Sequence, residues 1–255
     1  FGSPPLISNV KISPSGEKIA VYATLKNGDS AILVRDLTKN EPYKSIASSD
    51  NKSLKLLSFN WFDDEIILAR AWLAQDVYNT KLDYYRLLRV NVDGSGFKPL
   101  FKKRHFKDLP LRWEEFDQTR IIDWLPDDED NILVQLRMSN ARSPDVIKLN
   151  VKENSIKTVK KGVAGVGSWM TDEDGRVRIG QTYDRDRSTG SIIFQREGST
   201  KWRTVWDYSS FGEDAISVLG FGEAPNKVWY EAYKDGRLAV FSADISKQNI
   251  EPELV

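Results

Sequence analysis

The sequence contains no cysteine and only one histidine, His105. The absence of cysteine excludes disulfide bonds, thiol nucleophiles and cysteine metal sites. A single histidine excludes a histidine metal cluster, and any Ser-His-Asp triad would have to use His105. Cysteine chemistry and histidine metal clusters are therefore closed to this chain.

The sequence also lacks an excess of either charge and any long apolar run. Lys+Arg and Asp+Glu each number 37 among 255 residues. Nucleic-acid and polybasic membrane binding both depend on a basic excess, so we expect no nucleic-acid partner. No apolar run approaches the roughly 18 residues of a membrane-spanning helix. The opening "FGSPPLISN" has no charged region followed by an apolar one, so we expect no signal peptide in this chain.

Short stretches of alternating apolar and polar residues recur instead, with turn residues between them. The best example is "RVNVDGSGFKPLF", residues 89–101, in which a strand pattern is followed by Asp-Gly-Ser-Gly and a second short strand. Similar segments begin near residues 34, 148, 194 and 242, which makes five in all. Four of the five share an Asx residue, at Asp36, Asn91, Asn150 and Asp244. Self-similarity at such spacings indicates a repeat architecture.

A second series of hairpins precedes the first, with one copy ahead of each segment. These copies are residues 10–23, 59–71, 122–136, 168–182 and 219–233. Together the two series predict an all-β chain of about five four-stranded antiparallel propeller blades. The approximate blades are residues 6–48, 54–101, 119–161, 164–207 and 215–255.

Two segments fit the repeat less well. Residues 63–88 contain helix formers after an acidic start, but the repeat register favours two blade strands with an inserted loop near 74–82. Residues 102–118 exceed an ordinary turn, so we expect a loop or a short helix there.

The motifs that resemble ligand sites are better explained as turns. Asp93-Gly94-Ser95-Gly96 is followed by Pro99 and a strand, whereas a phosphate-binding loop opens a helix. Asx-Gly dipeptides between strands are a hairpin signal. The acidic runs 127–130 and 172–174 recur at one place in the repeat, which blade hairpins explain, so we expect no metal site and no cofactor.

No catalytic residue is predicted. The sequence has no G-x-S-x-G motif and no strand–helix alternation to carry one, so His105 is expected in a basic solvated loop. The one substrate-binding candidate is the pair Glu114 and Glu115, because paired carboxylates can hold an ammonium group.

Several repeats resemble known propellers. The stretch "SPSGEKIAVYA" (13–23) resembles the repeat of TolB-like periplasmic propellers. With "IIDWLPDDEDNILVQL", "WMTDEDGRVRIG" and "DGRLAVFSADI" in that order, nearly the whole chain resembles the N-terminal propeller of bacterial prolyl oligopeptidase-family serine peptidases, of the acylaminoacyl-peptidase or dipeptidyl-aminopeptidase type. In that family a propeller, usually of seven or eight blades, caps an α/β-hydrolase domain with a Ser-Asp-His triad, so the resemblance implies that the five blades are part of a seven- or eight-bladed ring. No position here matches the triad motifs.

The resemblance implies a non-catalytic propeller that admits short peptides to a C-terminal hydrolase domain. Its expected partners are that domain and the peptide substrate, and its expected location is periplasmic or secreted, although the residues themselves leave a cytoplasmic location open. The alternatives are a stand-alone TolB-like protein-binding propeller and a sugar-processing propeller with inward-facing acid pairs. An incomplete ring would expose two blade faces, so we also expect self-association.

Overall fold

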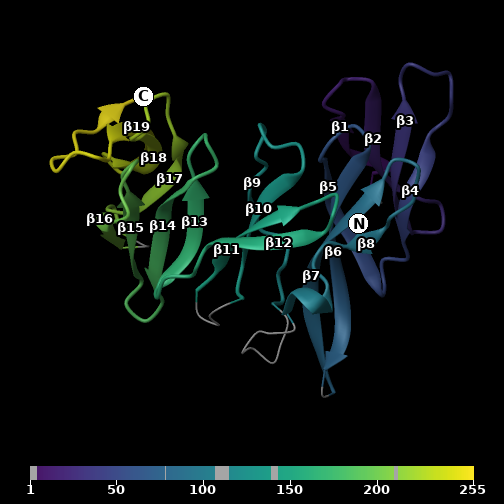
Figure 1. Ribbon diagram of the computed structural model, residues 1–255, viewed down its shortest axis with the longest axis horizontal. Helices are drawn as coiled ribbons and strands as arrows, with labels where there is room; N and C mark the ends of the chain where they lie inside the picture. Colours follow the sequence, from purple (N-terminus) through teal and green to yellow (C-terminus); the bar gives the residue numbers. More distant parts are fainter. Residues whose placement is uncertain (1–4, 78, 107–114, 139–142, 210–211) are drawn as a thin grey trace. The chain divides into compact units, whose positions relative to one another are not determined.

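The computed structural model describes residues 5–77, 79–106, 115–138, 143–209 and 212–255. Within these ranges the chain forms five antiparallel sheets of four strands each, and the strands of each sheet follow one another in sequence (Figure 1). The expected all-β architecture of four-stranded blades is therefore confirmed. The helix signal in residues 63–88 does not produce a helix, because these residues pair as strands.

The chain divides into two compact units. The first holds two sheets together with residues 150–155, and the second holds the three sheets that follow. The strands of the first unit are β1 (Ile7–Ile12), β2 (Lys18–Thr24), β3 (Ser30–Asp36), β4 (Lys44–Ser49), β5 (Leu54–Trp61), β6 (Ile66–Val77), β7 (Thr80–Asn91) and β8 (Lys98–Pro99). A 3-10 helix, η1 (Lys103–Phe106), follows β8.

The second unit contains the remaining twelve strands. They are β9 (Ile121–Asp123), β10 (Asn131–Leu136), β11 (Asp145–Asn150), β12 (Ser155–Lys160), β13 (Val166–Thr171), β14 (Val177–Asp184), β15 (Thr189–Gln195), β16 (Trp202–Ser209), β17 (Ile216–Phe221), β18 (Lys227–Lys234), β19 (Arg237–Asp244) and β20 (Glu253–Leu254).

Each unit has its core between neighbouring sheets. In the first unit, Ala20, Ile32 and Val34 pack with Ile67 and Val90 between the sheets β1–β4 and β5–β8. In the second unit, an equivalent cluster between β13–β16 and β17–β20 contains, among others, Ile179, Ile192, Phe194, Val228, Tyr230 and Ala243. Alternate residues of each strand face opposite sides, so each internal sheet can pack on both faces.

The turn at Asp93–Gly96 is a hairpin turn, as the sequence predicts. The amide of Gly94 donates to the carbonyl of Asn91, and the amide of Ser95 donates to Asp93 Oδ1. Gly94 and Gly96 have φ of 84° and 70°, a region that favours glycine. Lys44 Nζ in the preceding sheet donates to the carbonyl of Asp93 at 2.8 Å, so the turn ties two sheets together.

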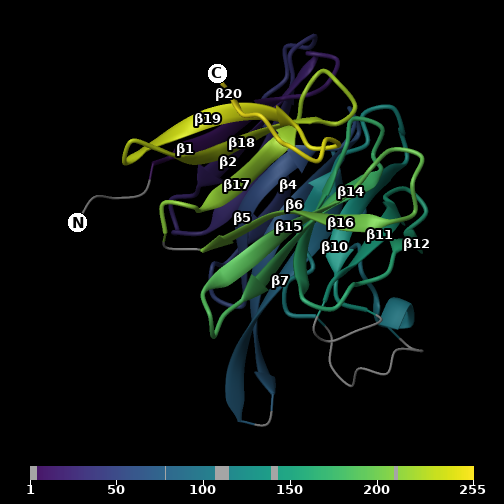
Figure 2. The same ribbon diagram turned by 90° about the vertical axis from the view of Figure 1, so that its left-hand side faces the viewer.

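The prediction of an inserted loop near residues 74–82 is wrong. The ladder between β6 and β7 continues without a break from Ile66↔Asn91 to Val77↔Thr80, so both strands reach twelve residues (Figure 2). The extra length of this segment is therefore strand and not loop. Residues 103–106 form the short helix that was one of the two expectations for 102–118.

Candidate functional site

Of the two carboxylates predicted to bind substrate, one lies within the described residues. Glu114 lies outside the described residues, whereas Glu115 begins a segment that runs beside β7. Arg86 Nη1 donates to the carbonyls of Glu115 and Phe116, each at 3.2 Å, and the Phe116 ring lies 5.1 Å from that of Tyr84. The main chain at Glu115 is therefore held by the buried arginine of β7.

His105 lies in η1 among basic neighbours. Its ring nitrogens are 3.3 Å from the Lys102 amide and from Arg104 Nε. Burial, and secondly the charge of Arg104, lower the pKa of His105. Neither of the two hydrogen bonds described for this ring involves a carboxylate or a serine, so the ring does not have the arrangement of a catalytic base.

The acidic turns form ion pairs. Lys148 Nζ lies 2.6 Å from Asp128 Oδ2, and this contact, with a hydrogen bond from Asn131, lowers the pKa of Asp128 to about 2. Asp172 pairs with Arg178 instead. Among the described residues, no group of three or more His, Cys, Asp or Glu side chains is placed to hold a metal ion.

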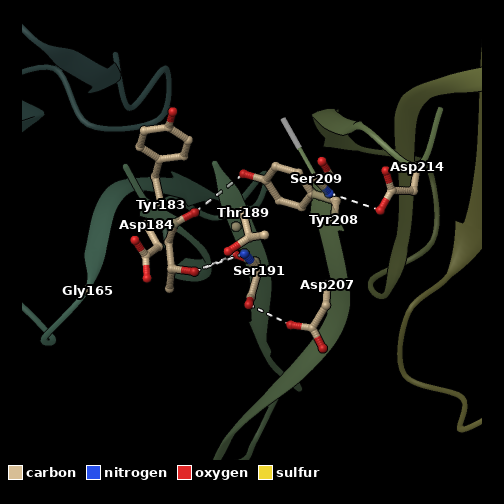
Figure 3. A pocket seen from close by; sticks show the side chains of 11 residues that line it. Gly165, Tyr183, Asp184, Thr189, Ser191, Asp207, Tyr208, Ser209 and Asp214 are labelled. Atoms are coloured by element: carbon tan, nitrogen blue, oxygen red, sulfur yellow. Dashed lines mark hydrogen bonds between the residues drawn. The ribbon is translucent and has the colours of Figure 1, made fainter. Parts of the chain in front are cut away.

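The structure contains a site that the sequence motifs did not indicate. A cavity of about 610 Å³ lies at one end of the sheet β13–β16, where β14 ends, β15 begins and β16 runs into the connection to β17 (Figure 3). Its lining includes three carboxylates, Asp184, Asp207 and Asp214, and the hydroxyl side chains of Thr182, Thr189, Ser191, Tyr208 and Ser209. None of the described lining residues is basic.

A hydrogen-bond network fixes the wall of this cavity. The buried Tyr208 hydroxyl accepts a bond from Gln181 Nε2 at 2.6 Å, and Ser191 Oγ donates to Asp207 Oδ1 at 2.6 Å. Asp214 Oδ2 accepts from the amide of Ser209 at 3.0 Å (Figure 3). Most of the side-chain polar atoms that the lining presents are therefore held in place before any ligand arrives.

Gly190 is required by the packing of this wall. A Cβ atom at this position would lie 2.4 Å from the Tyr208 hydroxyl and 2.6 Å from the carbonyl oxygen of Thr182. The tyrosine ring can cross strand β15 only because residue 190 has no side chain.

The lining of this cavity suits the binding of a polar ligand. Carboxylates and hydroxyls accept hydrogen bonds and offset positive charge, so the lining suits groups that carry N–H or O–H donors. Ser191 is hydrogen-bonded to the carboxylate of Asp207, and no imidazole is among the described residues that line the cavity.

The opposite end of the same sheet is held by a buried arginine. Arg178 pairs with Asp172 at 3.3 Å, and their side chains are 4% and 6% exposed. Its other donors reach the carbonyls of Gln195 and Pro225 and the side chain of Asn226. The guanidinium also lies about 5 Å from the ring centres of two phenylalanines, Phe194 and Phe221. Arg178 therefore joins two turns of its own sheet to the first turn of the next.

No protein-family profile and no curated protein matches the sequence. Solved structures do match its fold. A prolyl endopeptidase structure matches 98% of this chain at a TM-score of 0.59 and 11% identity, and the match covers 35% of that chain. Dipeptidyl peptidase 4 of Porphyromonas gingivalis matches 98% of this chain at 0.55 and 11% identity, over 40% of its own length.

The chain has the β-propeller fold. A propeller domain from the trilobed protease of Pyrococcus furiosus matches 98% of this chain at a TM-score of 0.50 and 13% identity. The propeller spans about a third of the prolyl endopeptidase chain that it matches. Within the described residues, no helix is long and apolar enough to cross a membrane.

Proposed function

We propose that this propeller is the non-catalytic domain of a serine peptidase and controls which peptides reach a C-terminal α/β-hydrolase domain. The observation that carries the proposal is the shared fold of five consecutive four-stranded sheets with peptidase structures of much greater length. The order of the repeat motifs along the chain supports the same family. Because the identity is near 11%, the activity rests on these two arguments together.

The filtering role follows from the rigidity of such a domain. Sheets that pack face to face through closely fitted cores deform little, so an opening between or beside them passes a flexible peptide and excludes a folded protein. We propose Glu115, with Glu114, as the group that meets the free amino terminus of a peptide, since a carboxylate pair offsets an ammonium charge.

The reading frame that encodes this chain gives the first test. The proposal expects a strand–helix pattern with a G-x-S-x-G motif after Val255. A frame without that pattern would favour the alternative, a stand-alone propeller that binds protein partners. The 255-residue chain itself should hydrolyse no peptide substrate, and hydrolysis by the purified chain would contradict the proposal.

Kinetics of the complete protein give the second test. It should cleave an unstructured peptide much faster than the same sequence held within a folded domain. Glu115→Gln should raise KM for peptides with a free amino terminus and leave KM for N-acylated peptides unchanged. Equal effects on both peptide classes would remove Glu115 from the proposed role.

A further inference from the structure

The cavity at the end of the sheet β13–β16 involves none of the residues on which the proposed function rests (Figure 3). All of its described lining lies between residues 165 and 214, within the second unit. The sheet has a neighbour on each face, because apolar clusters join it to β17–β20 on one side and to β9–β12 on the other. Its volume of about 610 Å³ is that of a site for a small molecule.

The strand register explains why this end of the sheet is polar. Two cross-strand rows contain only Asp, Ser and Thr, and they are Thr182↔Ser191↔Asp207 and Asp184↔Thr189↔Ser209. Residues two apart on a strand point to the same side, so the six side chains share one face, which we call the polar ledge. Ile193, two residues after Ser191, packs with Leu133 and Val146 on that face. The polar ledge therefore begins where the apolar packing between two sheets ends.

The next sheet ends differently on the corresponding face. On β18, Tyr230 packs into the core shared with β13–β16, so Lys234, four residues on, points to the same side. Lys234 pairs with Arg237 in the last pair of the hairpin β18–β19, as Asp184 pairs with Thr189 in the last pair of β14–β15. Two cations thus take the place of an acid and a hydroxyl. The polar ledge is therefore a property of one sheet and not a requirement of the repeat.

Two carboxylates of the lining are held by the chain through one oxygen each. Asp207 Oδ1 accepts from Ser191 Oγ at 2.6 Å, and Asp214 Oδ2 accepts from the amide of Ser209 at 3.0 Å. The other oxygen of each carboxylate forms no hydrogen bond with the described residues, and neither do the hydroxyls of Thr189 and Ser209. The cavity thus presents fixed side chains whose remaining polar atoms are available to a ligand.

These available atoms call for two kinds of ligand group. Ionised carboxylates only accept hydrogen bonds, and none of the described lining residues is basic, so a cation with N–H donors fits beside Asp207 and Asp214. Asp184 has a partner already, since it lies 3.8 Å from the exposed Arg187. Serine and threonine hydroxyls also carry a proton, which an ammonium group cannot accept. A ligand hydroxyl both accepts and donates, so it satisfies this second kind of atom.

We propose that this cavity binds a hydroxyl-rich organic amine, of which an amino sugar is the simplest kind. Its ammonium group would meet the free oxygens of Asp207 and Asp214, and its hydroxyl groups would bond to Thr189 and Ser209. Thr189 and Ser209 are directly paired across β15 and β16, so their Cβ atoms lie about 5 Å apart, within reach of one sugar ring. The carboxylates disfavour sugars that carry a carboxylate or a phosphate, because like charges repel.

Isothermal titration calorimetry of the 255-residue chain tests the ligand class. The probes are the β-1,4-linked disaccharide of glucosamine, at a pH where its amino groups are charged, and the same disaccharide with both amino groups acetylated. We expect the charged form to bind and the acetylated form to bind about tenfold more weakly or less, since only the ammonium groups differ. Equal binding of the two forms, or no binding of the charged form at millimolar concentration, would overturn the proposal.

Variants of the chain locate the ligand. Asp214→Asn removes a charge but keeps an acceptor for the Ser209 amide, and it should raise the dissociation constant of the charged disaccharide about tenfold. Ser209→Ala should raise it severalfold through the lost hydroxyl. Asp186→Asn removes the same charge from an exposed turn residue outside the lining and should leave the affinity unchanged.

Thermal melting should show that the three variants fold as the wild type does. An affinity that D214N and S209A do not change would place the ligand elsewhere and overturn the proposal. An equal loss in D186N and D214N would mean that the amine is attracted by net charge alone, which also overturns it.

Discussion

The two ends of the sheet β13–β16 use carboxylates in opposite ways. At one end Asp172 is buried against Arg178, which also donates hydrogen bonds to main-chain carbonyls and to Asn226. At the other end Asp207 and Asp214 line an open cavity with no basic residue among its described lining, and the third carboxylate of the lining, Asp184, pairs with the exposed Arg187 at 3.8 Å. Aspartate therefore stabilises the packing of the sheets at the end where it pairs with a buried cation. At the end where hydroxyl groups surround it, aspartate faces an open cavity.

Removal of the buried arginine should have the largest effect. Arg178→Met leaves the Asp172 carboxylate buried without its cation and should lower the free energy of unfolding by about 3–5 kcal/mol. Chemical denaturation measures the loss. Arg176→Met, two residues away, is the matched control, because Arg176 forms exposed ion pairs and its loss should cost much less stability. Equal losses would show that burial does not distinguish the two arginines.

A methyl group at Gly190 should have the next largest effect. The added Cβ would meet the Tyr208 hydroxyl and a main-chain oxygen, and such overpacking costs about 1–3 kcal/mol. Thermal unfolding measures this, with Gly220→Ala as the control, because a Cβ at Gly220 meets no atom within 4 Å. If the two variants have the same melting temperature, the residues around Gly190 shift to accommodate the added methyl group.

A smaller loss is expected when the hydroxyl in that wall is removed. Tyr208→Phe deletes the bond from Gln181 Nε2 but keeps the ring, so the free energy of unfolding should fall by about 0.5–1.5 kcal/mol. Denaturant titration of Tyr208→Phe, of Gln181→Leu and of the double variant measures the coupling energy between the two side chains. Additive effects of the two substitutions would show that the bond contributes nothing.

The smallest effect concerns Asp128, a half-buried counterpart of Asp172. The pKa of Asp128 is about 2 in the folded chain and its usual value is 3.8, so the ionised form favours folding. That contribution is present above about pH 4 and is lost as the pH falls through 2. Asp128→Asn should therefore lower stability at pH 7 by about 0.2–1 kcal/mol and by much less at pH 2. A difference independent of pH would exclude the Lys148 ion pair as its cause.

The sequence predicted the sheets better than the sites. Alternating apolar residues and Asx-Gly turns are local signals, and their repetition located five hairpin pairs. The length of β6 and β7 was mispredicted, because an ordinary blade sets no limit on how far a hairpin may extend. The cavity was missed because its residues come from three strands and two connections. One feature of the sequence could have indicated the buried Arg178, namely a charged residue between two apolar residues at the start of a strand.

The hairpin β6–β7 has a mechanical consequence. Its pairing with β5 ends at Leu73, so the last four residues of β6 continue beyond the edge of the sheet with β7 as their only ladder partner among the described strands. At about 3.3 Å per residue, the tip extends roughly 13 Å past the supported part. A rotation of the sheet would therefore displace the tip of this hairpin further than its supported part.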